Sequence, residues 1–348
     1  MDTRHYPVTD ADGGCRRLGF PVNLLTGFTA NLLTMVLTTP AASFSKKFCC
    51  TVFGLFLLVF SAGNAFAWQS SANMRYTLTS PFDLSMAWVA GGEFQMGDLA
   101  GTGQSDERPV RTIALPGFWI MHTEVTLNMF QHFVDATGYA MADGCGYFDG
   151  GWKQDQELNW RNPGFPQSQE HPVTCISWDD ANQFASWLSD TTGQTFTLPT
   201  EVQWEYAACA QTGSAYSFGD NASLLCTYAN GADQSALADY PDFDVTDCND
   251  EYTRTAPVAS YRDNAYGLHD MTGNVWEWVK DCYTQNYETA AAPSGNSEPD
   301  CERRVYRGGG YGDVPFFLRV SLRNRGYPDE RRDDVGFRLV LNKWSWEQ

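Results

Sequence analysis

"YGLHDMTGNVWEW", residues 266–278, combines a turn with an alternating aromatic run. Successive side chains of a strand point to opposite faces, so one face can bury Trp276 and Trp278 while the other presents Glu277. The stretch therefore predicts a turn at Gly273 that leads into a buried strand. A carboxylate on such a strand can satisfy backbone amides or help to hold a hard cation, and the residues alone leave both interpretations open.

Four other stretches predict regular elements. Residues 86–98 (MAWVAGGEFQMGD) alternate like a strand that runs into a glycine turn. Residues 118–139 and 171–193 each begin like a strand and continue with helical spacing, and the second helix should end at Gly193. Residues 198–209 predict a helix capped by Thr200. Residues 216–257 and 285–299 are loop-like, which gives a low helix content and long loops.

The composition indicates a folded and strongly acidic protein. The 348 residues include 42 acidic and 23 basic side chains, for a net charge of −19, and 43% of the residues are hydrophobic. This fraction is enough for a sizeable core. The negative charge disfavours nonspecific binding to nucleic acid or to anionic membranes, so we expect no nucleic-acid partner.

Residues 1–67 are expected to be an N-terminal extension and a secretory signal peptide. Lys46 and Lys47 precede a short apolar run that ends in the small-residue sequence AFA at 65–67. Met35 is a candidate for the true start. After cleavage we expect a periplasmic or secreted chain with no membrane span, a short linker at 68–84 and a single domain at 85–345.

Six stretches, in a single order along nearly all of the mature chain, resemble the formylglycine-generating enzyme (sulfatase-modifying factor) family. They are GGEFQMGD at 91–98, HPVTCISWDDA at 171–181, LPTEVQWEYA at 198–207, YGLHDMTGNVWEW at 266–278, RGGGY at 307–311 and GFR at 336–338. The resemblance implies an α+β domain with the C-type-lectin-like fold of that family, little regular secondary structure and structural calcium.

The resemblance also implies two calcium sites built from carboxylate and carbonyl oxygens. The ligands of the first would be Asp270, Gly273, Val275 and Glu277. The family usually has Asn at position 270, and Asp keeps the oxygen. The ligands of the second would be Asn230, Gly231, Asp250 and Tyr252.

Catalytic members of the family bind copper(I) through two cysteines near the C-terminus and oxidise a sulfatase cysteine with dioxygen. This chain has no cysteine after Cys301, and Asp313, Phe317 and Leu318 stand around the expected positions. Copper(I) needs soft thiolate ligands, so we expect no copper and no formylglycine generation by that mechanism.

An arginine-rich and aromatic C-terminal segment remains as a candidate ligand face. Arginine forks and aromatic rings are common in binding hot spots. The candidate ligand-binding residues are Tyr311, Asp313, Phe316, Phe317, Arg319, Arg323, Arg325, Tyr327 and Arg331. The alternative is that about half of the arginines are internal struts, with Arg319, Arg323 and above all Arg338 as candidates.

The same segment resembles the variable region of diversity-generating retroelement proteins, which share the fold. One chain cannot reveal sequence variation, so this alternative stays open.

Seven cysteines follow the predicted cleavage site, without a C-x-x-C motif or a histidine cluster that would indicate zinc. The expected pairs are Cys145–Cys175, Cys226–Cys248 and Cys282–Cys301. They rest on loop proximity, because the second would close the loop of the second calcium site and the third the loop before the arginines. Cys209 would then remain a buried thiol.

The leading functional hypothesis is an exported, calcium-stabilised binding domain whose partner is an unidentified protein, peptide or small molecule. The alternative is an oxidoreductase of formylglycine-generating-enzyme type, acting in sulfatase maturation or another periplasmic oxidation without cysteine. Its first candidate residues would be Tyr311, Arg319, Arg323 and Glu277. A structural accessory subunit is the third possibility.

Overall fold

The computed structural model describes residues 75–241, 243, 245–287 and 301–341. The predicted signal peptide and residues 68–74 of the predicted linker lie outside these residues, whereas residues 75–84 of that linker are described and include β1. The helices are α1 (Leu127–Thr137), α2 (Trp178–Thr192), α3 (Glu201–Cys209) and α4 (Leu225–Tyr228). The strands are β1 (Arg75–Leu78), β2 (Leu84–Val89), β3 (Gly92–Met96), β4 (Arg111–Leu115), β5 (Phe118–Met121), β6 (Cys145–Phe148), β7 (Trp152–Asp155), β8 (Phe196–Thr197), β9 (Trp276–Cys282), β10 (Arg304–Arg307), β11 (Arg323–Gly326), β12 (Val335–Gly336) and β13 (Val340–Leu341).

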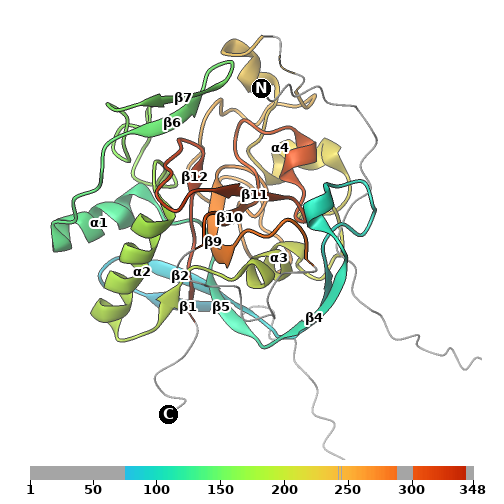
Figure 1. The fold of residues 1–348 in the computed structure, drawn as a ribbon, viewed down its shortest axis with the longest axis horizontal. Coiled ribbons are helices and arrows are strands. Elements are labelled where there is room, and N and C mark those ends of the chain that lie inside the picture. Colours follow the sequence, from blue (N-terminus) through green and yellow to red (C-terminus); the bar gives the residue numbers. More distant parts are fainter. Residues whose placement is uncertain (1–74, 242, 244, 288–300, 342–348) are drawn as a thin grey trace, which may run out of the picture. The chain divides into compact units, whose positions relative to one another are not determined.

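The strands form two main sheets and two hairpin-like ribbons. The first sheet has the order β1-β2-β5-β13-β8, and the second has the order β11-β10-β9-β12. β3 pairs with β4 and β6 pairs with β7, both antiparallel. Figure 1 shows the second sheet in orange and red near the centre of the fold, with α1 and α2 together on one side of it.

Two helix boundaries lie where the sequence predicts them, the end of α2 at Gly193 and the start of α3 at Thr200, whereas α4 lies in a stretch for which the sequence predicts a loop. The Ser177 side chain accepts a hydrogen bond from Asp180 N at the start of α2, and Gly193 ends that helix in the left-handed conformation at φ 69°. The Thr200 side chain accepts a bond from Gln203 N at the start of α3. These caps satisfy amides that the first helical turn leaves unbonded.

The stretch at 266–278 also folds as predicted. Gly273 is in the left-handed region at φ 83°, and β9 begins at Trp276. Trp276 and Trp278 are buried in one hydrophobic cluster together with Phe130 of α1 and Phe184 of α2. Val279, further along β9, belongs to a second cluster, which packs against α3. β9 is therefore shared by both parts of the core.

One predicted strand is wrong. Residues 171–177 form no strand, because their backbone bonds go to separate segments. Val173 N donates to Val125 O at 2.9 Å, whereas Cys175 N donates to Arg332 O at 2.9 Å. Cys175 also has a positive φ of 55°, which breaks the extended conformation. The segment instead joins α1 to the C-terminal region.

Within the described ranges, no helix combines the length and the apolar character that crossing a bilayer requires.

Candidate functional site

Three arginines of the C-terminal segment lie inside the molecule and pair with glutamates. Arg319 makes two bonds of 2.8 Å to Glu107, and both side chains are fully buried. Arg323 makes bonds of 2.6 and 3.0 Å to Glu201 of α3. Arg307 bonds to Glu205, one turn further along the same helix.

This arrangement corrects the expectation that Arg319 and Arg323 face a ligand. Their guanidiniums are struts that tie β11 and the preceding loop to the rest of the fold. A charge can be buried in this way because the paired carboxylates and extra carbonyl acceptors replace its lost water. Sequence reasoning missed the pairing role of Glu107, Glu201 and Glu205, because each of them lies at least 102 residues away from its arginine.

The predicted strut at Arg338 is confirmed. Its guanidinium makes two bonds of 2.7 Å to the carboxylate of Glu277, and all of these atoms are buried. Trp204 Nε1 donates to the same carboxylate at 2.8 Å. Both Glu277 oxygens are therefore already bonded to cationic or N–H groups, which leaves this carboxylate poorly suited to bind a cation as well.

A pair of buried acids lies next to this strut. Glu124 Oε1 accepts a bond from Asn274 at 2.9 Å, and Asp270 Oδ2 accepts one from Ala259 N at 2.8 Å. No hydrogen-bond donor among the described residues reaches the other oxygens, Glu124 Oε2 and Asp270 Oδ1. Burial raises the pKa of both carboxyls, and the nearby charge of Asp270 raises the pKa of Glu124 further. Arg338 Nη2 lies 4.0 Å from Glu124 Oε2, beyond hydrogen-bond distance. The chemistry of two buried carboxylate oxygens without hydrogen-bond donors among the described residues fits a bound cation.

The four residues of the second predicted calcium site come together in the structure. Asp250 accepts bonds from Gly231 N at 3.1 Å and from Tyr252 N at 2.9 Å. Asn230 Oδ1 is buried without a hydrogen-bond partner among the described residues. Burial raises the pKa of Asp250 to about 7, and the charge of Asp233 adds to this shift. Because amides already bond Asp250, this set fits a cation less well than the first.

Asn274 joins the two predicted sites. Its side chain donates to Glu124, which lies beside the first site but was not among its predicted ligands, and its Oδ1 accepts a bond of 3.2 Å from Asn230 Nδ2 in the second. Its backbone N–H donates to Asn230 O at 2.8 Å. A side chain at the neighbouring Gly273 would overlap the same Asn230 carbonyl oxygen. The two loops therefore touch at closely packed backbone.

All three predicted disulfides are confirmed. The structure contains Cys145–Cys175, Cys226–Cys248 and Cys282–Cys301. Cys209, which was expected to be a thiol after cleavage, is also disulfide-bonded in this structure, and its partner lies outside the described residues.

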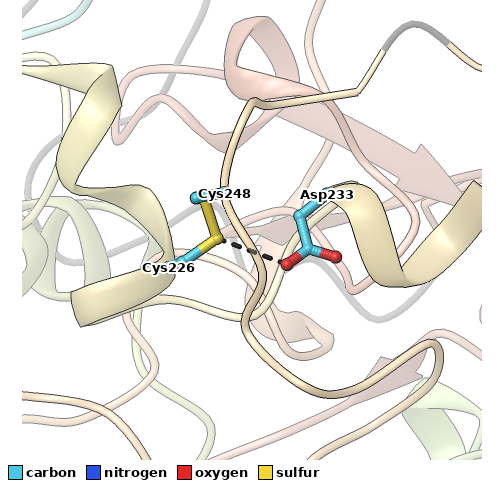
Figure 2. Close-up of side chains that lie close together, drawn as sticks. All are labelled: Cys226, Asp233 and Cys248. Atoms are coloured by element: carbon cyan, nitrogen blue, oxygen red, sulfur yellow. Dashed lines mark hydrogen bonds between the residues drawn. A yellow bond between two sulfur atoms is a disulfide. The ribbon is translucent and has the colours of Figure 1, made fainter.

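Asp233 lies against one of these disulfides (Figure 2). Its Oδ2 is 3.3 Å from Cys226 Sγ, and its carboxylate also accepts a bond from Asp250 N. Asp233, Cys226 and Cys248 are close enough together to suggest a metal site. Because Cys226 and Cys248 form a disulfide, however, the cluster offers no thiolate to a metal. Its role is to cross-link the loop that carries Asp250.

The remaining candidate ligand residues differ in exposure. Arg325 and Tyr327 are exposed, and Asp313, Phe316 and Phe317 are half-buried. Tyr311 is buried and donates to Asp333 at 2.9 Å. Arg331 is half-buried and pairs with Asp180 at 2.8 Å. The surface that a partner could reach is thus smaller than the sequence suggested, and it is centred on β11 and the short turn at 315–318.

Residues 79–343 match the Sulfatase-modifying factor enzyme 1-like domain. The formylglycine-generating enzyme of Streptomyces coelicolor is 33% identical over 289 residues, which cover 72% of this chain and 87% of that protein. The inactive C-alpha-formylglycine-generating enzyme 2 of Bos taurus is 28% identical over 291 residues, which cover 74% of this chain and 88% of that protein.

Among solved structures, PvdO from Pseudomonas aeruginosa superposes with a TM-score of 0.64 at 28% identity, covering 74% of this chain and 94% of that one. This similarity, together with the mixed sheets and few helices, confirms the predicted α+β fold class. The protein belongs to the sulfatase-modifying factor family, which includes the formylglycine-generating enzymes.

Proposed function

We propose that this chain is a calcium-stabilised binding domain of the family that does not oxidise sulfatase cysteines. The observation that carries the proposal is the state of its sulfur atoms. Every cysteine within the described residues is disulfide-bonded, and the sequence places none after Cys301. A disulfide sulfur is not a thiolate, and copper(I) in a protein needs thiolate or similarly soft ligands. The name of the bovine relative is a precedent for an inactive member of the family.

Oxidation without cysteine is the alternative, and the placement of its candidate residues weighs against it. Arg319, Arg323 and Glu277 are buried and bonded to opposite charges, so a substrate could reach them only if the struts broke. A catalytic group must come within hydrogen-bond reach of the reacting atoms. The buried Tyr311 hydroxyl, which is bonded to Asp333, is no more accessible.

Calcium is the cation that we propose for the pair of buried acids. Glu124 and Asp270 would supply carboxylate oxygens, and Gly273 and Val275 would supply the carbonyl oxygens that the resemblance implies. Calcium accepts such mixed oxygen sets. We leave Glu277 out of this ligand set because Arg338 and Trp204 already bond it. Asn230, Gly231, Asp250 and Tyr252 remain the candidates for a second ion.

We also propose that the chain works in an oxidising compartment, such as the periplasm or the extracellular space. Structural disulfides form and persist in such compartments and are rare in a reducing cytosol. The partner would bind at the exposed part of the C-terminal face, around Arg325, Tyr327 and the half-buried Phe317.

The proposal fails if the protein generates formylglycine. The experiment incubates the purified protein with copper(I), dioxygen and a cysteine-containing sulfatase peptide, and detects an aldehyde by hydrazide trapping and mass spectrometry. We expect no aldehyde, with a cysteine-containing family enzyme as the positive control. Aldehyde formation that depends on this protein would overturn the proposal.

Calcium is tested separately, by thermal unfolding with calcium or with EDTA. Ligand at 100 times its Kd should stabilise the fold by about 2.7 kcal/mol. Asp270→Asn and Glu124→Gln should remove most of this increment, whereas Glu277→Gln should destabilise the protein but keep it. Asp135→Asn, at an exposed site on α1, is the control. Equal melting temperatures of the unmodified protein in calcium and in EDTA would show that calcium does not stabilise the fold.

A further inference from the structure

Strand β11 ends the second sheet, and its outer edge has no strand partner in the described part of the chain. The sheet order β11-β10-β9-β12 puts Arg323–Gly326 at its end, and no other described strand pairs with that outer edge. The N–H of Arg325 is bonded by the adjacent side chain, Asn324 Oδ1 at 2.9 Å, in place of a neighbouring strand. Unpaired edges of this kind can accept an added strand.

Two arginines on this sheet are held against tyrosine rings. The guanidinium of Arg303 lies 4.2 Å from the ring centre of Tyr327 and donates to its hydroxyl at 2.8 Å. Arg325 lies 4.4 Å from the ring centre of Tyr283 and donates to its hydroxyl at 3.1 Å. Stacking on a ring fixes a guanidinium before a partner arrives, which reduces the ordering cost of binding.

Within the described residues, neither Arg303 nor Arg325 forms an ion pair with a carboxylate. This is informative in a chain with 42 acidic and only 23 basic side chains, in which the buried neighbour Arg323 has an acidic partner. Two preordered cations, neither with a carboxylate partner among the described residues, therefore lie next to the outer edge of β11, where side chains bond the N–H groups of Arg325 and Tyr327.

The spacing of the two arginines suits an extended ligand. Arg304 pairs with Gly326 and Val305 pairs with Arg325, so Arg303, the residue directly before β10, lies diagonal to Arg325 in this register. Diagonal neighbours lie about 7–8 Å apart, which matches the separation of alternate residues along a strand. Carboxylates at alternate positions of an added strand would share one face and could reach both guanidiniums.

We propose that an acidic peptide segment in extended conformation binds along β11, with its backbone paired to the strand edge and its carboxylates on Arg303 and Arg325. The inference rests on the proposed binding function and names the class of its partner. Backbone pairing would supply affinity, and the two arginines would select acidic side chains.

The test uses the full chain and a short fluorescent peptide of alternating glutamate and valine, with binding followed by anisotropy. The double variant Arg303→Gln/Arg325→Gln should weaken binding about tenfold or more, as expected for loss of hot-spot arginines. Arg161→Gln is the matched control, because Arg161 is also exposed and stacked, 4.0 Å from the ring centre of Trp160. It should leave binding unchanged.

Two further peptides separate strand addition from simple charge attraction. A peptide with alternate backbone nitrogens methylated on the pairing edge should bind about tenfold more weakly, and a lysine–valine peptide should not bind. Equal binding of the methylated peptide, or full competition by inorganic phosphate at similar affinity, would overturn the proposal in favour of a plain oxyanion site. If no acidic peptide binds and no aldehyde forms in the separate assay, this inference fails while the proposed function stands.

Discussion

Arg323 and Arg325 are two residues apart on one strand, and they show how differently the same side chain is used. Both guanidiniums lie over the ring of Tyr283, at 5.1 and 4.4 Å from its centre. The Arg323 guanidinium is buried and bonded to Glu201, whereas Arg325 is exposed and its guanidinium is bonded to the Tyr283 hydroxyl. The two side chains lie on the same face of β11, so the difference between a structural arginine and a binding arginine is how deeply each position is buried.

The largest expected effect would come from removing the inner arginine. Arg323→Ala leaves Glu201 buried with a much weaker partner, since Arg307 lies 3.4 Å away and is shared with Glu205. Breaking a buried ion pair in this way costs about 3–5 kcal/mol. Urea unfolding measures the loss. A loss below about 1 kcal/mol would show that Arg323 is not a strut, and the two arginines would then not differ in their structural role.

Asp333 is a buried acid that forms no ion pair with an arginine among the described residues, and its protonation should make stability depend on pH. Burial and the neighbouring Asp334 raise the pKa of Asp333 to about 7. The folded state then keeps a proton that the unfolded state releases near pH 4, so this residue makes stability fall as pH rises from about 4 to 7. The slope is at most about 1.4 kcal/mol per pH unit.

Asp333→Asn tests this dependence because it keeps an acceptor for the Tyr311 hydroxyl but cannot ionise. Urea unfolding at several pH values should show a smaller decline between pH 4 and 7 in the variant. An identical decline in both proteins would mean that Asp333 is ionised throughout this range.

A third variant separates the two roles of Tyr283. Its hydroxyl donates to Asp106 at 2.9 Å and accepts from Arg325, while its ring lies under both arginines. Tyr283→Phe keeps the ring and removes the hydroxyl, so we expect a loss of about 1 kcal/mol from the unsatisfied Asp106 oxygen. Thermal or urea unfolding gives the value. No loss would mean that water replaces the hydroxyl.

The smallest effect is expected for the outer arginine. Arg325→Gln should change the free energy of unfolding by less than about 0.5 kcal/mol, as is usual for surface substitutions. Unfolding under the conditions used for Arg323→Ala makes the two values directly comparable. A loss as large as that of Arg323→Ala would show that the two arginines have the same structural role.

Much of the scaffold could be predicted from local sequence signals. The cap at Thr200, the end of α2 at Gly193, the strand after Gly273 and the three disulfides follow from residue type and loop position. Arg338 could be recognised as a strut from its place in the GFR motif. Such features depend on neighbours along the chain, which a single sequence displays.

The parts that could not be predicted depend on contacts between distant segments. Arg323 and Arg325 share a strand face, so periodicity cannot separate them; Glu201, 122 residues away from Arg323, does. Nothing in the spacing of Glu124 and Asp270 along the sequence indicates that their carboxyl groups interact. The hydrogen bond from Cys175 N to Arg332 O interrupts a stretch that, taken alone, looks like a strand. These outcomes are decided by tertiary packing, which overrides local preference.

The contact between Gly273, Asn274 and Asn230 has a consequence for protein engineering. Because a methyl group at position 273 would meet the Asn230 carbonyl, this joint permits only glycine without displacement of a loop. A loop exchange that moves residue 230 would also shift the start of β9, because Asn274 N donates to Asn230 O. Since β9 contributes to both hydrophobic clusters, such a change would disturb both of them. Designers who wish to reuse this scaffold should therefore hold these three residues fixed and vary the surface beyond β11.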